Sequence, residues 1–123
     1  MASLPAGYIA NPSGYTPSGA TVTQQTNRTT GVTINALSGV ITTNTTSQAV
    51  ETATKFTVTN NQVSIGDVVV VSQQSGSNSG ATDVAVSTVA NGSFQIMVTD
   101  NNAAAGTAET GAILINFAII KGG

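Results

Sequence analysis

The chain has 123 residues, only 7% of them charged, and a formal net charge of −2 at pH 7. A chain of this length predicts one domain, and its three cations, Arg28, Lys55 and Lys121, lie too far apart in the sequence to neutralise the phosphates of a nucleic acid. The chain contains no cysteine and no histidine, which excludes disulfides, thiolate catalysis and the commonest general base and metal ligand. No apolar run reaches the roughly 18 residues of a membrane-spanning helix.

Residues 1–28 differ from the rest of the chain, because they hold all three prolines and both tyrosines. Proline cannot donate to a sheet ladder, so this segment cannot form a regular helix or a central strand. One interpretation is a loosely attached leader. The alternative, which we favour, is an extended arm that anchors on a neighbouring subunit through Tyr8, Ile9 and Tyr15, because tyrosine combines a large apolar face with a polar tip.

From residue 31 onward, short runs of alternating apolar residues are separated by turn residues, a pattern typical of a β-sandwich or barrel. The dipeptide Asn91-Gly92 is a strong signal for a two-residue hairpin. We therefore expect an all-β fold: a small β-sandwich, jelly-roll or immunoglobulin-like, of about seven strands over residues 29–123, with an extended N-terminal arm over residues 1–28. The expected strands cover residues 31–36, 40–43, 54–59, 68–71, 84–89, 94–98 and 112–120.

The expected strands carry more apolar side chains than one core requires. The core-facing set is predicted to be Ile34, Phe56, Val58, Val68, Val70, Phe94, Ile96, Val98, Ile115, Phe117 and Ile119. The opposite faces would then hold Val69, Val71, Met97, Leu114 and Ile120, where a free sandwich would be polar. We therefore expect an oligomer interface formed by Val69, Val71, Leu114 and Ile120.

The residues that usually carry out catalysis or bind metals are sparse. Each of the five carboxylates falls in a predicted turn or loop, which favours a solvated turn residue over a catalytic pair. The run Asp100-Asn101-Asn102 is similar to the start of a calcium loop, but it lacks the later ligands, so an Asx turn is predicted. We therefore expect no catalytic residues, no metal, no cofactor and no small-molecule substrate, and a protein that is not an enzyme.

Several strand segments resemble those of small structural proteins from tailed phages, notably cyanophages and other aquatic phages. The resemblance covers about residues 27–121 and is carried by 30–35 (TGVTIN), 39–42 (GVIT), 56–60 (FTVTN), 67–71 (DVVVV), 92–94 (GSF) and 115–121 (INFAIIK). It implies a virion protein of the capsid decoration (cement) type, which binds the outside of the major capsid protein shell, often as a trimer, and stabilises it. It brings no catalytic residues.

The expectation is therefore a homotrimer on the capsid surface, made in the bacterial host cytoplasm, with the strand faces in the trimer core and Tyr8, Ile9 and Tyr15 reaching the shell or an adjacent subunit. The absence of cysteine and of signal-peptide features at the N-terminus agrees with cytoplasmic synthesis. One alternative is a head-fibre, tail-fibre or other tail component. Another is a carbohydrate-binding, adhesin-like sandwich, although the chain has no tryptophan and both tyrosines lie in the arm.

Overall fold

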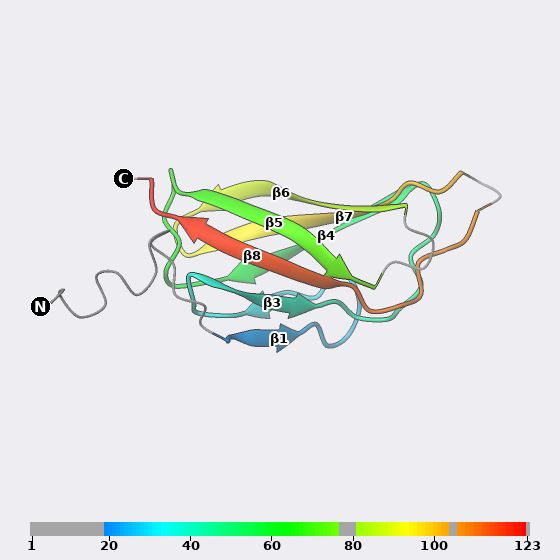
Figure 1. Ribbon diagram of the computed structural model, residues 1–123, viewed down its shortest axis with the longest axis horizontal. Coiled ribbons are helices and arrows are strands. Elements are labelled where there is room, and N and C mark those ends of the chain that lie inside the picture. The colour runs from blue at the N-terminus through cyan, green and yellow to red at the C-terminus, as the bar shows by residue number, and fades with distance from the viewer. Residues whose placement is uncertain (1–18, 77–80, 104–105, 123) are drawn as a thin grey trace, which may run out of the picture.

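The computed structural model describes residues 19–76, 81–103 and 106–122, and within them the chain forms eight strands and no helix. Figure 1 shows these strands in two layers. This confirms the all-β sandwich, and none of the described residues belongs to a helix that could cross a membrane. The strands are β1 (Thr21–Thr23), β2 (Val32–Thr33), β3 (Ser38–Thr42), β4 (Thr52–Thr59), β5 (Val68–Ser75), β6 (Thr82–Ala90), β7 (Ser93–Asp100) and β8 (Leu114–Ile120).

The strands are divided between two four-stranded sheets. Sheet A has the order β1-β3-β8-β5 and sheet B has the order β2-β4-β7-β6. The pairs β1/β3 and β2/β4 are parallel and the other pairs are antiparallel. Together with the arrow directions in Figure 1, these pairings show that odd-numbered strands run one way and even-numbered strands the other, so every connection lies at one of two ends of the sandwich. The connections after β1, β3, β5 and β7 form one end, which we call the loop end. Those after β2, β4 and β6 form the other, with the start of β1 and the end of β8.

The core fills the space between the sheets, and its side chains follow the two-residue period of the strands. In β7 and β8, every second residue is buried. The rings of Phe94 in β7 and Phe117 in β8 meet across the layers, with their centroids 5.6 Å apart. The buried apolar side chains are Val32, Ile34, Ile41, Phe56, Val58, Val63, Phe94, Ile96, Val98, Ile113, Ile115, Phe117 and Ile119.

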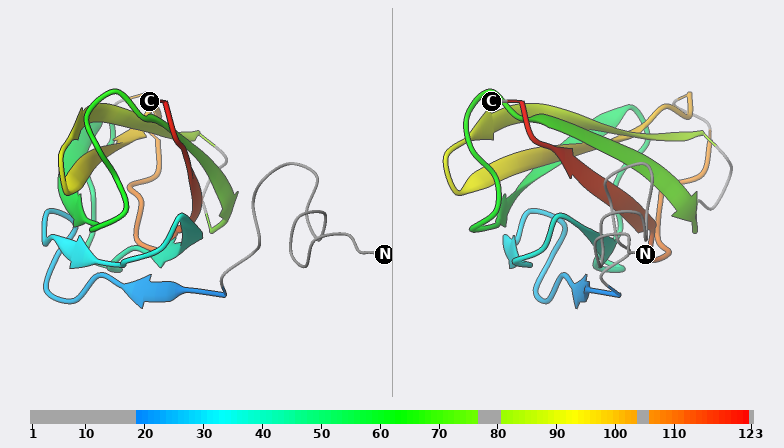
Figure 2. Two further views of the ribbon diagram at one scale, coloured as in Figure 1. Left: turned by 90° about the vertical axis from the view of Figure 1, so that its left-hand side faces the viewer. Right: turned by 60° about the vertical axis from the view of Figure 1, so that its left-hand side comes forward.

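The hairpin predicted at Asn91-Gly92 is present and joins β6 to β7. Gly92 has a φ of 83°, a left-handed conformation that glycine adopts without steric cost. Strands β5 and β6, the last of their sheets, lie side by side along one border of the sandwich (Figure 1 and Figure 2). Each carries a register irregularity, between Gln73 and Ser75 in β5 and between Val86 and Thr88 in β6. Such bulges bend an edge strand and discourage further strand pairing.

Two sequence-based assignments differ from the structure. The prediction that Val68 and Val70 belong to the core is wrong: they face outward, and Val69 and Val71 pack against the core instead. Four consecutive valines carry no alternation, so the phase of this strand could not be read from the sequence. Residues 19–28, which the predicted arm included, form part of the sandwich, because β1 pairs with β3 and the side chains of Gln24 and Arg28 are buried.

Candidate functional site

The outward face of sheet B is polar. Its side chains alternate with the buried ones of β4 and β7, and its apolar members in the described strands are Met97 and three small alanines, Ala53, Ala85 and Ala90. Met97 pairs with Lys55 on one side and with Ala85 on the other. The polar members are Thr33, Lys55, Thr57, Thr59, Asp83, Thr88, Ser93, Gln95 and Thr99.

The outward face of sheet A is different, because it is uncharged and largely apolar along β5 and β8. One rung joins Val70 to Ala118 and Ala118 to Ser38, and another joins Val68 to Ile120. The outward side chains are Thr21, Thr23, Ser38, Val40, Thr42, Val68, Val70, Ser72, Leu114, Asn116, Ala118 and Ile120. The two outward faces of one sandwich thus differ in chemistry.

The most exposed large apolar side chains in the described residues gather at one end of this face. Val68, Val70 and Ile120 are 52%, 47% and 42% exposed, and Ile65, in the loop before β5, is 69% exposed. We call these four residues the apolar patch. Isolated exposed apolar side chains are common on protein surfaces, but a group on adjacent strands is typical of an interaction site.

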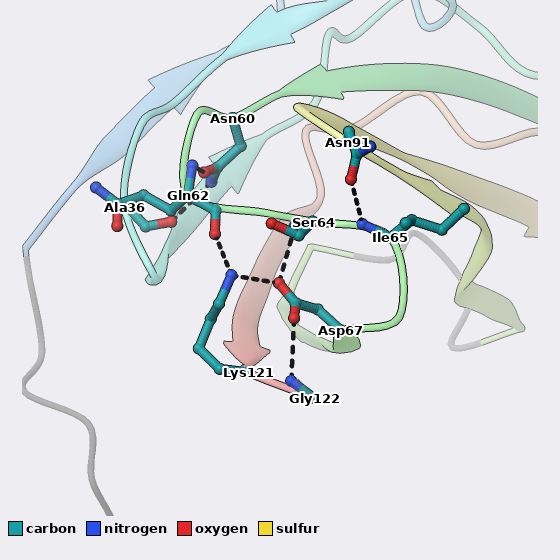
Figure 3. Close-up of polar contacts among 9 residues, drawn as sticks. All are labelled: Ala36, Asn60, Gln62, Ser64, Ile65, Asp67, Asn91, Lys121 and Gly122. Atoms are coloured by element: carbon teal, nitrogen blue, oxygen red, sulfur yellow. Dashed lines mark hydrogen bonds and ion pairs between the residues drawn. The ribbon is translucent and has the colours of Figure 1, made fainter.

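A polar cluster holds the segment that carries this patch (Figure 3). Asp67 lies between Ile65 and Val68, and its carboxylate accepts hydrogen bonds from the backbone N–H groups of Ser64 (2.9 Å) and Gly122 (3.0 Å). Lys121, next to Ile120, donates to Asp67 Oδ2 at 2.5 Å and to the carbonyl of Gln62 at 2.7 Å. The carboxylate therefore joins the loop before β5 to the end of β8, the two segments from which the patch projects.

Neighbouring amides fix the same loop from its other side. Asn91 Oδ1 accepts from the backbone N–H of Ile65 at 2.7 Å, and the Ile65 side chain points away from the polar contacts (Figure 3). Asn60 is fully buried, and its Nδ2 donates to the carbonyl of Ala36 at 2.7 Å. Each amide joins segments far apart in the sequence, so the loop is held in place by these hydrogen bonds. Ile65 is therefore an exposed apolar side chain on a fixed loop.

The contacts of Asp67 lower its pKa to about 2. The hydrogen bond from Lys121 is the largest cause, followed by the hydrogen bonds from the backbone of Gly122 and Ser64. A carboxylate with a depressed pKa in the folded state contributes stability above the pKa of the unfolded chain, about 3.9, and loses it as the pH falls through the folded value. This contribution is therefore present at neutral pH and disappears between about pH 4 and pH 2.

We expect the variant Asp67→Asn to be less stable than the wild type at pH 7 and to show a weaker loss of stability between about pH 4 and pH 2. The midpoint of urea unfolding, followed by far-ultraviolet circular dichroism at each pH, measures this. The matched control is Asp83→Asn, at an exposed carboxylate on the outward face of β6, which should retain the wild-type loss. Parallel acid profiles for Asp67→Asn and the wild type would contradict the assignment.

Two shallow hollows flank β8 on the outward face of sheet A. The larger, about 370 Å³, lies toward β1 and β3, and the smaller, about 160 Å³, lies toward β5. No charged residue lines either of them. The larger is lined by Gly19, Ala20, Thr21, Ser38, Gly39, Val40, Asn116 and Phe117, and the smaller by Val70, Val71, Ser72, Asn116, Phe117 and Ala118.

Most of the charged groups at the loop end are buried, outside both hollows. The prediction that the carboxylates are solvated turn residues is wrong for Asp67, Asp100 and Glu109, each of which is buried. Glu109 accepts a hydrogen bond from Thr82 Oγ1 at 2.6 Å, and its backbone exchanges two hydrogen bonds with Gln48. These carboxylates accept hydrogen bonds from other groups of the chain and are shielded from solvent.

Arg28 is the cation at the centre of this end. Its guanidinium donates to the carbonyl of Thr46, to Thr43 Oγ1 at 3.4 Å and to the carbonyls of Glu109 and Gly111 at 3.4 and 2.9 Å. Burial lowers the pKa of Arg28 from its ordinary value, and the charge of Glu109 raises it. The side chain thus joins the connections after β1, β3 and β7, a structural role that no local sequence pattern predicts.

The Asx turn predicted at Asp100 is present, since Asp100 Oδ1 accepts from the backbone N–H of Asn102 at 2.9 Å. Its other oxygen, Oδ2, is buried without a hydrogen-bond partner in the described part of the chain. Nowhere in residues 19–76, 81–103 and 106–122 do three acidic, histidine or cysteine side chains gather to hold a metal ion. We therefore assign no cation site to this turn.

The predicted interface residues are placed as follows. Val69 and Val71 are half-buried against the core, Leu114 is half-buried on the outward face of β8, and Ile120 is exposed there. Tyr8, Ile9 and Tyr15 lie outside the described residues. Ile65 was not among the predicted residues, because it lies in a loop just before Gly66-Asp67, where no strand period marks its orientation.

No protein-family model matches the chain, and no curated protein or solved structure matches it significantly.

Proposed function

We propose that this chain is a non-enzymatic structural protein of a phage virion, which decorates the outside of the major capsid protein shell as a homotrimer and stabilises it. One observation carries the assembly role: the outward face of sheet A is uncharged and bears the apolar patch, whereas the outward face of sheet B is polar. The capsid as the location is supported by the sequence resemblance to small structural proteins of tailed phages.

The chemistry of the patch supports burial against another protein. Covering the exposed parts of Ile65, Val68, Val70 and Ile120 would contribute on the order of 1 kcal/mol for each side chain. No unpaired charge would be buried, because Asp67 and Lys121 beside the patch already pair with each other. We therefore propose the apolar patch as the contact between subunits of the trimer, in place of the predicted set that included Val69 and Val71.

The shell contact is proposed for the N-terminal arm. Tyr8 and Ile9 belong to a segment without a charged side chain, and tyrosine is enriched at protein interfaces. Three arms from one trimer would bind the shell together, so weak individual contacts would add to a strong attachment.

Sugar binding has less support. The three phenylalanines, Phe56, Phe94 and Phe117, are all buried, so the described residues present no exposed aromatic ring on which a sugar could stack.

The subunit contact is tested with Val70→Lys, which places a charge in the middle of the patch. We expect light scattering after gel filtration to show a trimer for the wild type and at least a tenfold weaker association for the variant, since an unpaired buried charge opposes assembly by more than about 1.4 kcal/mol. Lysine is well tolerated on an edge strand, so the fold should persist.

The matched control is Ala85→Lys, at an exposed position on the outward face of β6, which should remain a trimer. A wild-type monomer, or equal association of both variants, would contradict the subunit contact.

The location is tested on the particle. Purified protein carrying a gold label should rebind capsids from which the native protein has been stripped, and electron microscopy should show the label at the junctions between capsomers. Label on the tail would favour a tail or fibre component. Absence of rebinding would overturn the proposal.

A further inference from the structure

The larger hollow on sheet A lies where the described chain begins. Gly19 and Ala20 line it together with Ser38 and Val40 of β3 and Asn116 of β8. Its volume of about 370 Å³ falls in the range of sites that hold a large organic group. Any segment that precedes Gly19 therefore leaves from the rim of this hollow.

Residues 1–18 match the hollow in chemistry. The segment has no charged side chain, and Tyr15 lies four residues before Gly19. Four extended residues reach at most about 14 Å, whereas neighbouring strands are about 4.8 Å apart, so Tyr15 can reach any part of a hollow that spans β1, β3 and β8. A tether this short also gives a high effective concentration, which favours docking on the same chain.

The hollow offers a polar group as well as apolar walls. Asn116 is half-buried at its side, and its carboxamide makes no hydrogen bond to any other described residue. A tyrosine ring that packs against Val40 could place its hydroxyl group within hydrogen-bond distance of this amide. The apolar ring and the polar hydroxyl group would then each have a partner.

We propose that the end of this segment nearest the sandwich docks on sheet A of its own chain, with Tyr15 seated in the hollow between β1, β3 and β8 and with Tyr8 and Ile9 left for the shell contact. This inference goes beyond the proposed function, because it concerns the isolated chain and requires no capsid. Docking would fix the origin of the arm and extend the apolar face of sheet A across β3.

The composition of the chain supplies the probe. It has no tryptophan and only two tyrosines, so in the full-length variant Tyr8→Phe all tyrosine fluorescence comes from Tyr15. We expect acrylamide to quench this fluorescence about fivefold less than it quenches N-acetyltyrosinamide, because a seated ring is covered by protein.

Two variants of the hollow, Val40→Lys and Thr21→Lys, should each restore quenching close to that of the free compound. Thr21 is exposed on the edge strand β1, so at least this variant is expected to fold. The matched control is Thr57→Lys, a half-buried outward position in sheet B, which should leave Tyr15 protected. Quenching equal to that of the free compound without any substitution, or restored equally by Thr57→Lys, would overturn the proposal.

A cysteine pair distinguishes docking on the same chain from docking on a neighbour, because the native chain has no cysteine. With Tyr15→Cys and Val40→Cys, oxidation should give a crosslinked product of monomer mass on a non-reducing gel. The control pair Tyr15→Cys and Thr57→Cys should remain uncrosslinked. A product of dimer mass from the first pair, or no product at all, would overturn docking on the same chain.

Discussion

Replacing Phe117 by alanine is expected to lower the free energy of unfolding by about 3–5 kcal/mol. Phe117 is buried in β8, contacts Phe94 of the other sheet and lies under both hollows, so its loss would leave a cavity between the layers. Gly39, which pairs with Phe117, has no side chain that could fill this cavity. Urea unfolding followed by circular dichroism measures the effect.

A change of similar size on the outer surface provides the control. Met97→Ala removes a half-buried side chain from the outward face of β7, and we expect it to cost about 1 kcal/mol or less. Equal losses for Phe117→Ala and Met97→Ala would show that the contact between the sheets is not the main source of stability.

Replacing Arg28 by methionine, which matches the aliphatic stem of arginine but lacks the guanidinium, is expected to cost about 3–5 kcal/mol of stability. The variant would keep much of the apolar volume but leave the carbonyls of Thr46 and Gly111 and the hydroxyl of Thr43 without this donor. Buried acceptors that lose their partner cost about 1–3 kcal/mol each, and Glu109 would lose the nearby positive charge. Thermal unfolding and hydrogen exchange at the loop end measure the effect.

Lys55→Met is the control for charge, since Lys55 is exposed on the outward face of sheet B. We expect its free energy of unfolding to stay within about 0.5 kcal/mol of the wild type. Arg28→Lys should fall between the two, because an ammonium group cannot donate in the directions of a guanidinium fork. Wild-type stability for Arg28→Met would mean that water replaces the guanidinium at the loop end.

The strands of this protein could be predicted from the sequence because most carry a clear two-residue period. In β4, Phe56 and Val58 face inward while Lys55 and Thr57 face outward, as the alternation indicates. The hairpin at Asn91-Gly92 follows equally directly from the need for a left-handed residue. The short strand β1 carried no such signal, because three residues are too few to show a period.

The candidate site could be predicted only in part, for two physical reasons. The valine run at 68–71 is apolar on both sides, so an exposed apolar face could be predicted there. Which two valines face outward could not be predicted, and the structure shows that they are Val68 and Val70. Burial of Asp67 and Arg28 depends on hydrogen bonds to segments 54 and 83 residues away along the chain. No local sequence pattern predicts hydrogen-bond partners that lie so far away along the chain.

Because strand direction alternates along the chain, both flanks of the sandwich lie at the end opposite the loop end. With eight strands, the polypeptide enters the sandwich at Gly19 and leaves it at Gly122 on the same side of the body (Figure 1). A molecule attached to a surface through either flank would therefore point its loop end, which includes the connections after β3 and β7, away from that surface. A protein fused to a flank would lie next to that surface, whereas a peptide inserted into a connection at the loop end would be displayed away from it.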